Sequence, residues 1–190
     1  IEDKEFILEQ FISDPETYPL KTPSGKVEIF CQKIADMKHD DCPGHPAWLE
    51  KSECLTSPQA KRYPLHLVSN QPQSRLHSQL DFGRTSLDAK VAGREPVMIN
   101  DDDANQRGIK TGDTVRIYNE RGACLAGAVV SDLVMPRVIQ LSTGAWYDPV
   151  LDGDEIDLDR GGNPNVLTRD VGSSALGQGP TAHSCLVEIE

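Results

Sequence analysis

Short runs of β-forming residues follow one another from Tyr63 onward, and they limit the possible folds more than any other feature of the chain. Each run is bounded by Gly, Asn, Asp or Pro, residues that end strands and form turns. Six strands of this length predict a small, mainly β domain closed into a barrel, which leaves few strand edges unpaired. The runs are PLHLVS (64–69), PVMIN (96–100), TVRIYN (114–119), CLAGAVVS (124–131), VIQLS (138–142) and CLVEIE (185–190).

One short helix is predicted between the second and third runs, in DDDANQRGIKTGD (101–113). Asn100 has the side chain of a helix cap, and three aspartates at 101–103 lie in the first turn, where the helix dipole favours negative charge. Gly108 can take the left-handed conformation that ends a helix. The segment NERG (119–122) then has the composition of a hairpin turn, with Gly122 free to adopt a positive φ.

Residues 1–60 have a different texture, because prolines and glycines interrupt every periodic pattern within a few residues. We expect them to form an extension that packs on neighbouring domains, and residues 61–190 to form the barrel domain. Inside the extension, KVEIF (26–30) alternates like a strand, with Val27 and Ile29 on one face.

The chain begins with IEDKEFILEQF and not with methionine, so we expect it to be a piece of a longer protein. Phe6, Ile7, Phe11 and Ile12 have helical spacing, and Asp3 could cap that helix.

Charge and cysteine content exclude several classes of protein. Lys and Arg number 19 against 30 Asp and Glu, a net charge of −11 that would repel nucleic acid or an anionic membrane. No apolar stretch is long enough to span a membrane, so we expect a soluble protein. The five cysteines never form a C-x-x-C pair, which argues against zinc or iron–sulfur sites and favours buried thiols. Charge and cysteine content do not decide between bacterial periplasm and cytoplasm.

Two polar segments stand out as candidate binding regions. SRLHSQLD (74–81) contains an arginine, a histidine and a glutamine at alternate positions, an unusual mixture for a solvated surface strand. Residues 143–181 are glycine-rich and form the longest stretch without clear periodicity; a loop of that length in a compact domain is usually functional or disordered, and we expect function.

Seven segments, in this order and spacing, resemble the C-terminal domain of the molybdopterin oxidoreductases, in the group of dimethyl sulfoxide, trimethylamine N-oxide and biotin sulfoxide reductases. The resemblance covers nearly the whole chain. The segments are TPSGKVEIF (22–30), PGHPAW (43–48), RLHSQL (75–80), GREPVMIN (93–100), DDANQRGIKTGDTVRIYNERG (102–122), GAWYDP (144–149) and GNPNVLTRDVGSSALGQG (162–179).

The resemblance implies a six-stranded double-psi β-barrel that covers one side of a bis(molybdopterin guanine dinucleotide) molybdenum cofactor. The parent reaction implied is the two-electron reduction of an S-oxide or N-oxide. In this group the serine ligand of the metal lies in N-terminal domains, so the chain would contain neither catalytic nor metal-binding residues, would be inactive alone, and would have the other domains of the parent as partners.

The resemblance also implies which residues bind the cofactor. A pterin is a flat heterocycle with donors and acceptors along its edge, which amides, hydroxyls, Arg and His can match. If residues 75–79 are extended, the three longer polar side chains share one face and Leu76 anchors the other. The expected cofactor-binding residues are Ser69, Gln71, Arg75, His77, Ser78, Gln79, Asn163, Asn165 and Gln178.

Simpler interpretations accompany these. We interpret His66 as a strand residue and not as a ligand, and Trp146 and Tyr147 as residues that pin a loop. Asp157, Asp159 and Gly162 match three positions of a calcium-binding loop, but the remaining positions of that loop do not match.

The main alternative function is a double-psi barrel adaptor that binds a protein partner. An adaptor would need an exposed apolar patch, whereas the cofactor hypothesis needs a polar concave wall. A metal hydrolase using His66 and His77 lacks a helix-spaced ligand pair.

Overall fold

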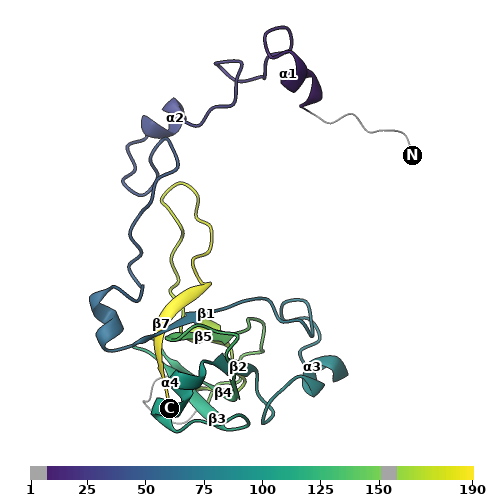
Figure 1. Cartoon of the computed structure of the whole chain (residues 1–190), viewed down its shortest axis with the longest axis vertical. Coiled ribbons are helices and arrows are strands. Elements are labelled where there is room, and N and C mark those ends of the chain that lie inside the picture. The colour runs from purple at the N-terminus through teal and green to yellow at the C-terminus, as the bar shows by residue number, and fades with distance from the viewer. Residues whose placement is uncertain (1–7, 151–157) are drawn as a thin grey trace. The chain divides into compact units, whose positions relative to one another are not determined.

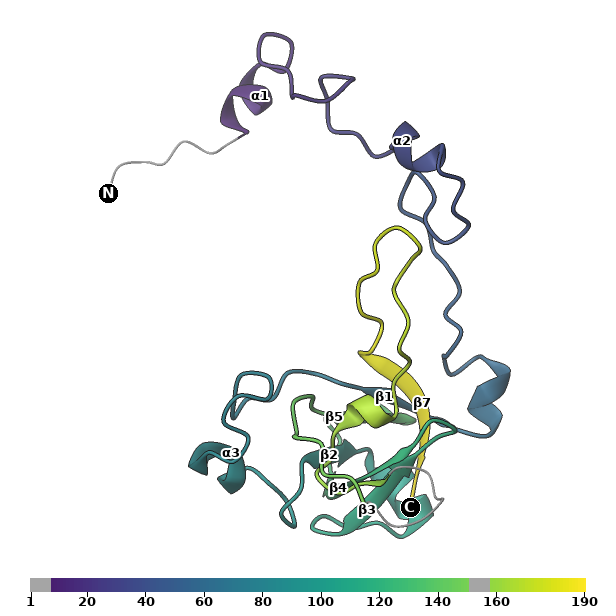
Figure 2. The same cartoon turned by 180° about the vertical axis from the view of Figure 1, so that it is seen from behind.

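A computed structural model describes residues 8–150 and 158–190 (Figures 1 and 2). Contacts divide these residues into two units, one of residues 8–50 with 174–177 and one that contains every strand described below. The helices are α1 (Glu9–Ser13), α2 (Gln32–Ala35), α3 (Arg84–Asp88) and α4 (Asp101–Arg107), with 3-10 helices η1 (Pro58–Lys61) and η2 (Pro164–Val166). The strands are β1 (Leu65–Val68), β2 (Pro96–Ile99), β3 (Thr114–Tyr118), β4 (Ala123–Val130), β5 (Val138–Leu141), β6 (Leu158–Asp159) and β7 (Ser184–Ile189).

Six of the strands close into a ring, which confirms the predicted barrel. The order is β2-β5-β1-β7-β3-β4, and β4 returns to pair with β2. The pairs β1–β5 and β2–β4 are parallel and the other pairs of the ring are antiparallel. Because β4 is eight residues long, the edge that pairs with β2 at 127–130 also has room for β6 at 123–124.

The barrel closes around side chains that alternate along each strand. Leu65 and Leu67 of β1 are fully buried, as are Val97 and Ile99 of β2, while the residues between them are partly exposed. This two-residue period is what places one face of each strand in the core. Complete burial of a Leu or Ile side chain contributes about 1.5–3 kcal/mol to folding, so the inward-facing positions account for much of the stability of the ring.

Helix α4 forms as predicted. The side chain of Asn100 accepts a hydrogen bond from Asp102 N–H (3.0 Å), and Gly108 ends the helix in the left-handed region at φ 70°. The hairpin turn at 119–122 is also present, but Gly122 does not take the positive φ that we expected. The side chain of Asn119 closes the turn instead, by accepting from Arg121 N–H (2.9 Å).

The predicted strand at 26–30 is wrong. Residues 27 and 28 have no regular structure and the others lie in bends, with Val27 68% and Ile29 77% exposed. A strand needs a neighbour to pair with its backbone, and among the described residues this segment has none. The N-terminal helix is confirmed only in part, because α1 begins at Glu9; Asp3, Phe6 and Ile7 lie outside the described residues.

Buried thiols were expected, and Cys124 and Cys185 are buried while the other three cysteines are half-buried. Burial raises the pKa of the Cys185 thiol to about 12, so this thiol is uncharged at neutral pH. Among the described helices, we find none that combines the length and apolar character of a membrane span.

Candidate functional site

The parallel pairing of β1 with β5 decides where the site forms. Two parallel neighbours end at the same edge of a sheet, so the loops that follow β1 and β5 leave the barrel together. Asn70 joins them: its carbonyl accepts from Thr143 N–H (2.8 Å), and its side-chain oxygen accepts from Ser142 Oγ (3.1 Å). The first loop continues into the polar segment 74–81 and the second into 143–149.

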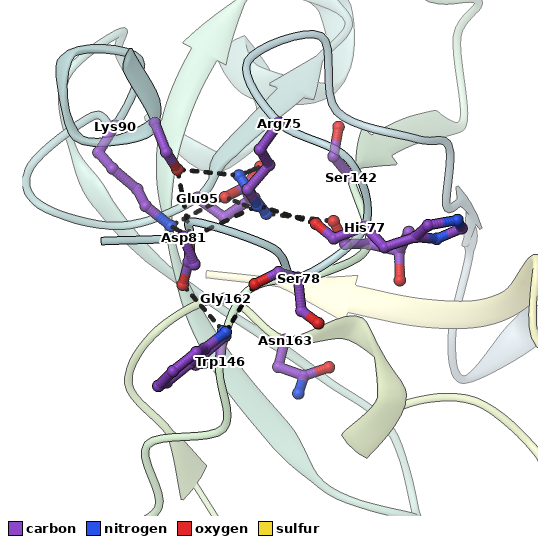
Figure 3. A network of polar contacts seen from close by, with 12 residues as sticks. Arg75, His77, Ser78, Asp81, Lys90, Glu95, Ser142, Trp146, Gly162 and Asn163 are labelled. Atoms are coloured by element: carbon purple, nitrogen blue, oxygen red, sulfur yellow. Dashed lines mark hydrogen bonds and ion pairs between the residues drawn. The ribbon is translucent and has the colours of Figure 1, made fainter. Parts of the chain in front are cut away.

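These two loops meet a third, around residues 163–165, and enclose a cavity of about 360 Å³ that we call the cleft. Figure 3 shows Ser78, Trp146 and Asn163 lying close together, with His77 to one side. The structure therefore brings four of the predicted residues to one place, from segments more than eighty positions apart. The cleft is lined by His77, Ser78, Thr143, Gly144, Ala145, Trp146, Tyr147, Asn163 and Asn165.

Segment 75–79 is not extended, so the expected alternation of its side chains is wrong. The backbone turns there, with positive φ at His77 (52°) and Leu80 (58°). Leu76 was expected to anchor the segment, but it is 62% exposed.

Arg75 anchors the segment instead, because its side chain is only 2% exposed and all its nitrogens bond within the protein. It forms an ion-pair cluster with Asp81, Lys90 and Glu95, which contains two positive and two negative charges (Figure 3). Lys90 Nζ lies 2.7 Å from Asp81 and 3.0 Å from Glu95, and Arg75 lies 3.1 Å from Glu95. Arg75 also donates to the carbonyls of His77 (3.1 Å) and Thr143 (3.1 Å), which fixes both loops of the cleft.

Three members of the cluster, Arg75, Lys90 and Glu95, also line a second cavity of about 400 Å³. Its other walls include Met98 of β2, Val129 of β4 and Gln140 of β5. Of the nine predicted cofactor-binding residues, Arg75 alone lines this cavity.

The carboxyl group of Asp81 is affected by opposing influences. Burial raises its pKa, but hydrogen bonds from Lys90 and from Trp146 N–H, with the charges of Lys90 and Arg75, lower it more, so the net pKa lies below the ordinary value of 3.8. A carboxyl group with a lowered pKa in the folded state stabilises the fold above the ordinary value, and that contribution is lost as the pH falls through the folded-state pKa.

We therefore expect the stability difference between the wild type and Asp81→Asn to depend on pH. The difference should be largest near pH 7 and should shrink as the pH falls below about 3.8. Urea denaturation of both chains over a series of pH values measures it. A difference that stayed constant down to pH 2 would show that the charge of Asp81 contributes nothing to the cluster.

Trp146 connects the loops, which agrees with its interpretation from the sequence as a residue that pins a loop. Its backbone N–H donates to Asp81 (3.0 Å), and its indole Nε1 donates to the carbonyl of Ser78 (2.8 Å). The ring packs edge-on against Phe82 at 5.1 Å between centroids and is still half-exposed toward the cleft. Trp146 thus pins segment 77–78 and forms part of the wall.

Glycines allow the walls to approach each other. Gly144 has φ 94°, and a Cβ at this position would lie 2.1 Å from the carbonyl oxygen of His77. Gly162 has φ 90°, and a Cβ there would lie 2.7 Å from the Cβ of Glu95. Only glycine combines this backbone conformation with such short approaches.

The third loop is held by the buried side chain of Asn119 and the partly buried side chain of Arg121. Asn119 donates from Nδ2 to the carbonyls of Leu167 (2.8 Å) and Leu186 (3.1 Å), and Arg121 donates from Nε to the same Leu167 carbonyl (2.8 Å). Arg121 also forms a two-point ion pair with buried Glu53 (2.8 and 2.9 Å). The hairpin turn therefore fixes η2 and the asparagines beside it.

The other predicted residues lie elsewhere. Ser69 is buried at the end of β1, where its N–H donates to the carbonyl of His183 (2.9 Å). Gln71, Gln79 and Gln178 are exposed, and none of them lines the cleft; Gln79 lines a neighbouring cavity of about 230 Å³. His66 is a half-buried residue of β1, and burial, helped by Lys51, lowers its pKa.

Three charged residues important to this site were not expected from the sequence: Lys90, Glu95 and Asp159. Asp159 is fully buried, and both of its oxygens accept backbone N–H groups, as a structural and not a calcium-binding carboxylate would; Asp157 lies outside the described residues. In the part of the chain that the structure describes, no group of three or more His, Cys, Asp and Glu side chains could hold a metal ion.

Known proteins resemble the chain in both sequence and fold. It is 53% identical over 182 residues to trimethylamine-N-oxide reductase 1 of Escherichia coli (strain K12), which covers 95% of the chain and 22% of the reductase. It is 50% identical to a dimethyl sulfoxide/trimethylamine N-oxide reductase (95% and 22%) and to a biotin sulfoxide reductase (96% and 24%), both of Cereibacter sphaeroides. The chain thus spans less than a quarter of the length of these relatives.

The solved structure of acetylene hydratase from Pelobacter acetylenicus superimposes with a TM-score of 0.71 at 19% identity, over 93% of the chain and 25% of the hydratase, which shows a shared fold. The profile of the family described as "Molydopterin dinucleotide binding domain" matches residues 65–186, from the first residue of β1 into β7. That match covers more than half of the chain and includes every wall of the cleft, so the chain belongs to the molybdopterin dinucleotide binding domain family.

Proposed function

We propose that the cleft binds the pterin part of a bis(molybdopterin guanine dinucleotide) molybdenum cofactor. The observation that carries the proposal is the supply of unused polar groups: among the hydrogen bonds of the described residues, none uses the side chains of His77, Ser78 or Asn165. Asn163 uses its Oδ1 to accept Asn165 N–H (3.0 Å), which leaves its Nδ2 as a donor. These groups suit the donor and acceptor edge of a flat heterocycle.

Aromatic side chains also support the fit. Trp146 and Tyr147 are each about half-exposed at the cleft and offer apolar surface next to the polar groups, a common composition of small-molecule sites. We propose that His77, Ser78, Asn163 and Asn165 bind the cofactor directly. For Ser69, Gln71, Arg75, Gln79 and Gln178 the cofactor-binding role stays a prediction.

We infer that the parent protein reduces an S-oxide or N-oxide, since the named relatives are reductases of trimethylamine N-oxide, dimethyl sulfoxide and biotin sulfoxide. The cofactor, when bound, would supply the two-electron chemistry. The residues of this chain would bind it, orient it and keep water from one side of it. We assign no catalytic or metal-binding residue to the chain.

We also infer that other domains of the parent cover the apolar side chains that this chain exposes. Leu76, Leu80 and Phe82, which are close to segment 77–78 in the sequence, and Leu87 of α3 are between 51% and 80% exposed. In the predicted extension 1–60, Ile29 is 77% and Trp48 79% exposed. Exposed apolar residues of this number indicate contact surfaces. The polar wall of the cleft favours the cofactor-binding function over an adaptor function.

The double variant His77→Ala with Asn165→Ala, made in the full-length parent, tests the proposal. Each lost polar contact in a water-poor site weakens binding by about 1–3 kcal/mol, so we expect affinity for the cofactor to fall on the order of a hundredfold. Molybdenum and pterin per mole of purified enzyme are the measurement. The matched control is His45→Ala with Asn105→Ala, which changes exposed residues of the same types. Equal pterin content in the two double variants would contradict the proposal.

A further inference from the structure

Asp159 occupies an unusual place at the end of β6. Its side chain is fully buried, yet each hydrogen bond that it accepts among the described residues comes from the backbone and not from a cation. Oδ2 accepts from the N–H groups of Gly161 (3.1 Å), Gly162 (2.8 Å) and Asn163 (2.7 Å). Oδ1 accepts from Asp148 N–H (2.8 Å).

These four bonds join two walls of the cleft. The three amides at 161–163 belong to the wall that carries Asn163 and Asn165, and Asp148 follows directly after Trp146 and Tyr147. The carbonyl of Asp148 accepts Arg160 N–H (2.9 Å), and Pro149 forms an isolated bridge with Asp159, so the two walls also pair through their backbones. Moving Asp159 would therefore move both walls at once.

Asp81 fixes the other end of segment 146–148. Asp81 accepts Trp146 N–H (3.0 Å), two residues before the amide that Asp159 accepts. Segment 146–148 is thus attached at both ends to buried carboxylates. Unlike Asp81, which pairs with Lys90 and Arg75, Asp159 owes its place to backbone N–H groups, which are strong partners for a carboxylate.

We propose that Asp159 is a positioning residue that shapes the cleft before any cofactor arrives. The effect of Asp159 on cofactor binding rests on the proposed function, whereas its effect on the shape of the cleft concerns the cofactor-free protein. The buried carboxylate holds the peptide groups of 148 and 161–163 in one arrangement. That arrangement sets the positions of the side chains at 146, 163 and 165. A site fixed in this way binds without first having to order its loops.

Asparagine is the informative replacement, because it keeps the size of the side chain and removes one acceptor. If its oxygen accepts the three amides at 161–163, its NH₂ group faces Asp148 N–H, and two donors meet. If it turns over, the NH₂ group faces the three amides instead. Either arrangement breaks the joint between the walls.

The first experiment compares Asp159→Asn with Asp148→Asn in the full-length parent reductase. The control makes the same chemical change in the same segment, at an exposed side chain that pairs with Arg160 (2.6 Å) near the surface. We expect Asp159→Asn to release pterin at least roughly tenfold faster than the wild type on dilution, and Asp148→Asn to release it at the wild-type rate. Pterin fluorescence in the filtrate follows the release.

The second experiment has a first readout in the wild type, which does not depend on whether a variant folds. Hydrogen exchange, followed by mass spectrometry in the cofactor-free wild-type reductase, should show peptides that contain 148 and 161–163 exchanging on the order of a hundredfold more slowly than exposed loop amides. The same peptides should exchange fast in Asp159→Asn.

The outcomes separate the two proposals. Fast exchange of these peptides in the cofactor-free wild type would overturn the positioning role. So would wild-type pterin release from Asp159→Asn in a parent whose His77→Ala with Asn165→Ala variant loses the cofactor. If that double variant keeps its full pterin content, the proposed function fails, and the role of Asp159 toward the cofactor fails with it.

Discussion

Replacing Gly144 with alanine is expected to lower the free energy of unfolding by about 3–5 kcal/mol, and to remove the cofactor from the parent enzyme. Two effects add up. A non-glycine residue at a strained positive φ costs about 1–3 kcal/mol, and forcing atoms into an occupied space costs about as much again. Here the new Cβ would lie 2.1 Å from the carbonyl oxygen of His77, which is backbone and cannot rotate away.

The cleft would open as a result, because relieving that contact requires segment 77–78 to move away from 143–146. Urea denaturation of the 190-residue chain measures the stability, and pterin content of the parent measures the binding. Gly112→Ala is the matched control, since Gly112 has nearly the same φ (97° against 94°) but no atom within 4 Å of a new Cβ. Equal destabilisation by the two alanines would mean that the close approach of the two loops is unimportant.

Removing the charge of Arg75 should have the second largest effect, a loss of about 3–5 kcal/mol for Arg75→Met. The side chains of Arg75, Asp81 and Glu95 are at least 94% buried, and Lys90 is 91% buried. Without Arg75 the cluster has two carboxylates and one ammonium group, so one buried negative charge lacks compensation. The loss of its bonds to the carbonyls of His77 and Thr143 adds to the effect.

Two further variants identify the cause. Arg84→Met removes an arginine whose pair with Asp88 is mostly exposed (95% and 73%), and it should change stability by less than about 0.5 kcal/mol. Adding Glu95→Gln to Arg75→Met removes the excess negative charge and should restore part of the lost stability, as a thermal or urea unfolding series would show. A double variant less stable than Arg75→Met alone would refute the charge explanation.

The barrel was predictable because local signals agreed with the global fold. The six β-forming runs became the six strands of the ring, and Asn100 and Gly108 marked the two ends of α4. Such signals depend on side-chain periodicity and on capping chemistry, which act over a few residues. The strand at 26–30 failed for the opposite reason, since a strand also requires a distant partner that local sequence does not reveal.

The sequence predicted that the two polar segments meet, but it did not predict their local geometry. His77, Ser78, Asn163 and Asn165 do meet at one cleft, although the predicted alternation along 75–79 is wrong. The charge of Arg75 marks it in the sequence as a candidate binding residue. The other members of its ion-pair cluster are 6, 15 and 20 positions away, and only the fold brings them together. Asp159 belongs to an acidic run, and nothing in that run distinguishes a carboxylate that binds four amides from its neighbours.

The ring of strands also sets the order in which the protein can form during synthesis. β7 pairs with β1 at residues 65–68 and with β3 at residues 117–118, so the ring keeps one gap with two unpaired edges until residues 184–189 have left the ribosome. Pairings between such distant segments are slow to form, and until they form the strand edges are exposed to aggregation. We therefore expect the edges of β1 and β3 in the nascent chain to stay open to aggregation until β7 emerges.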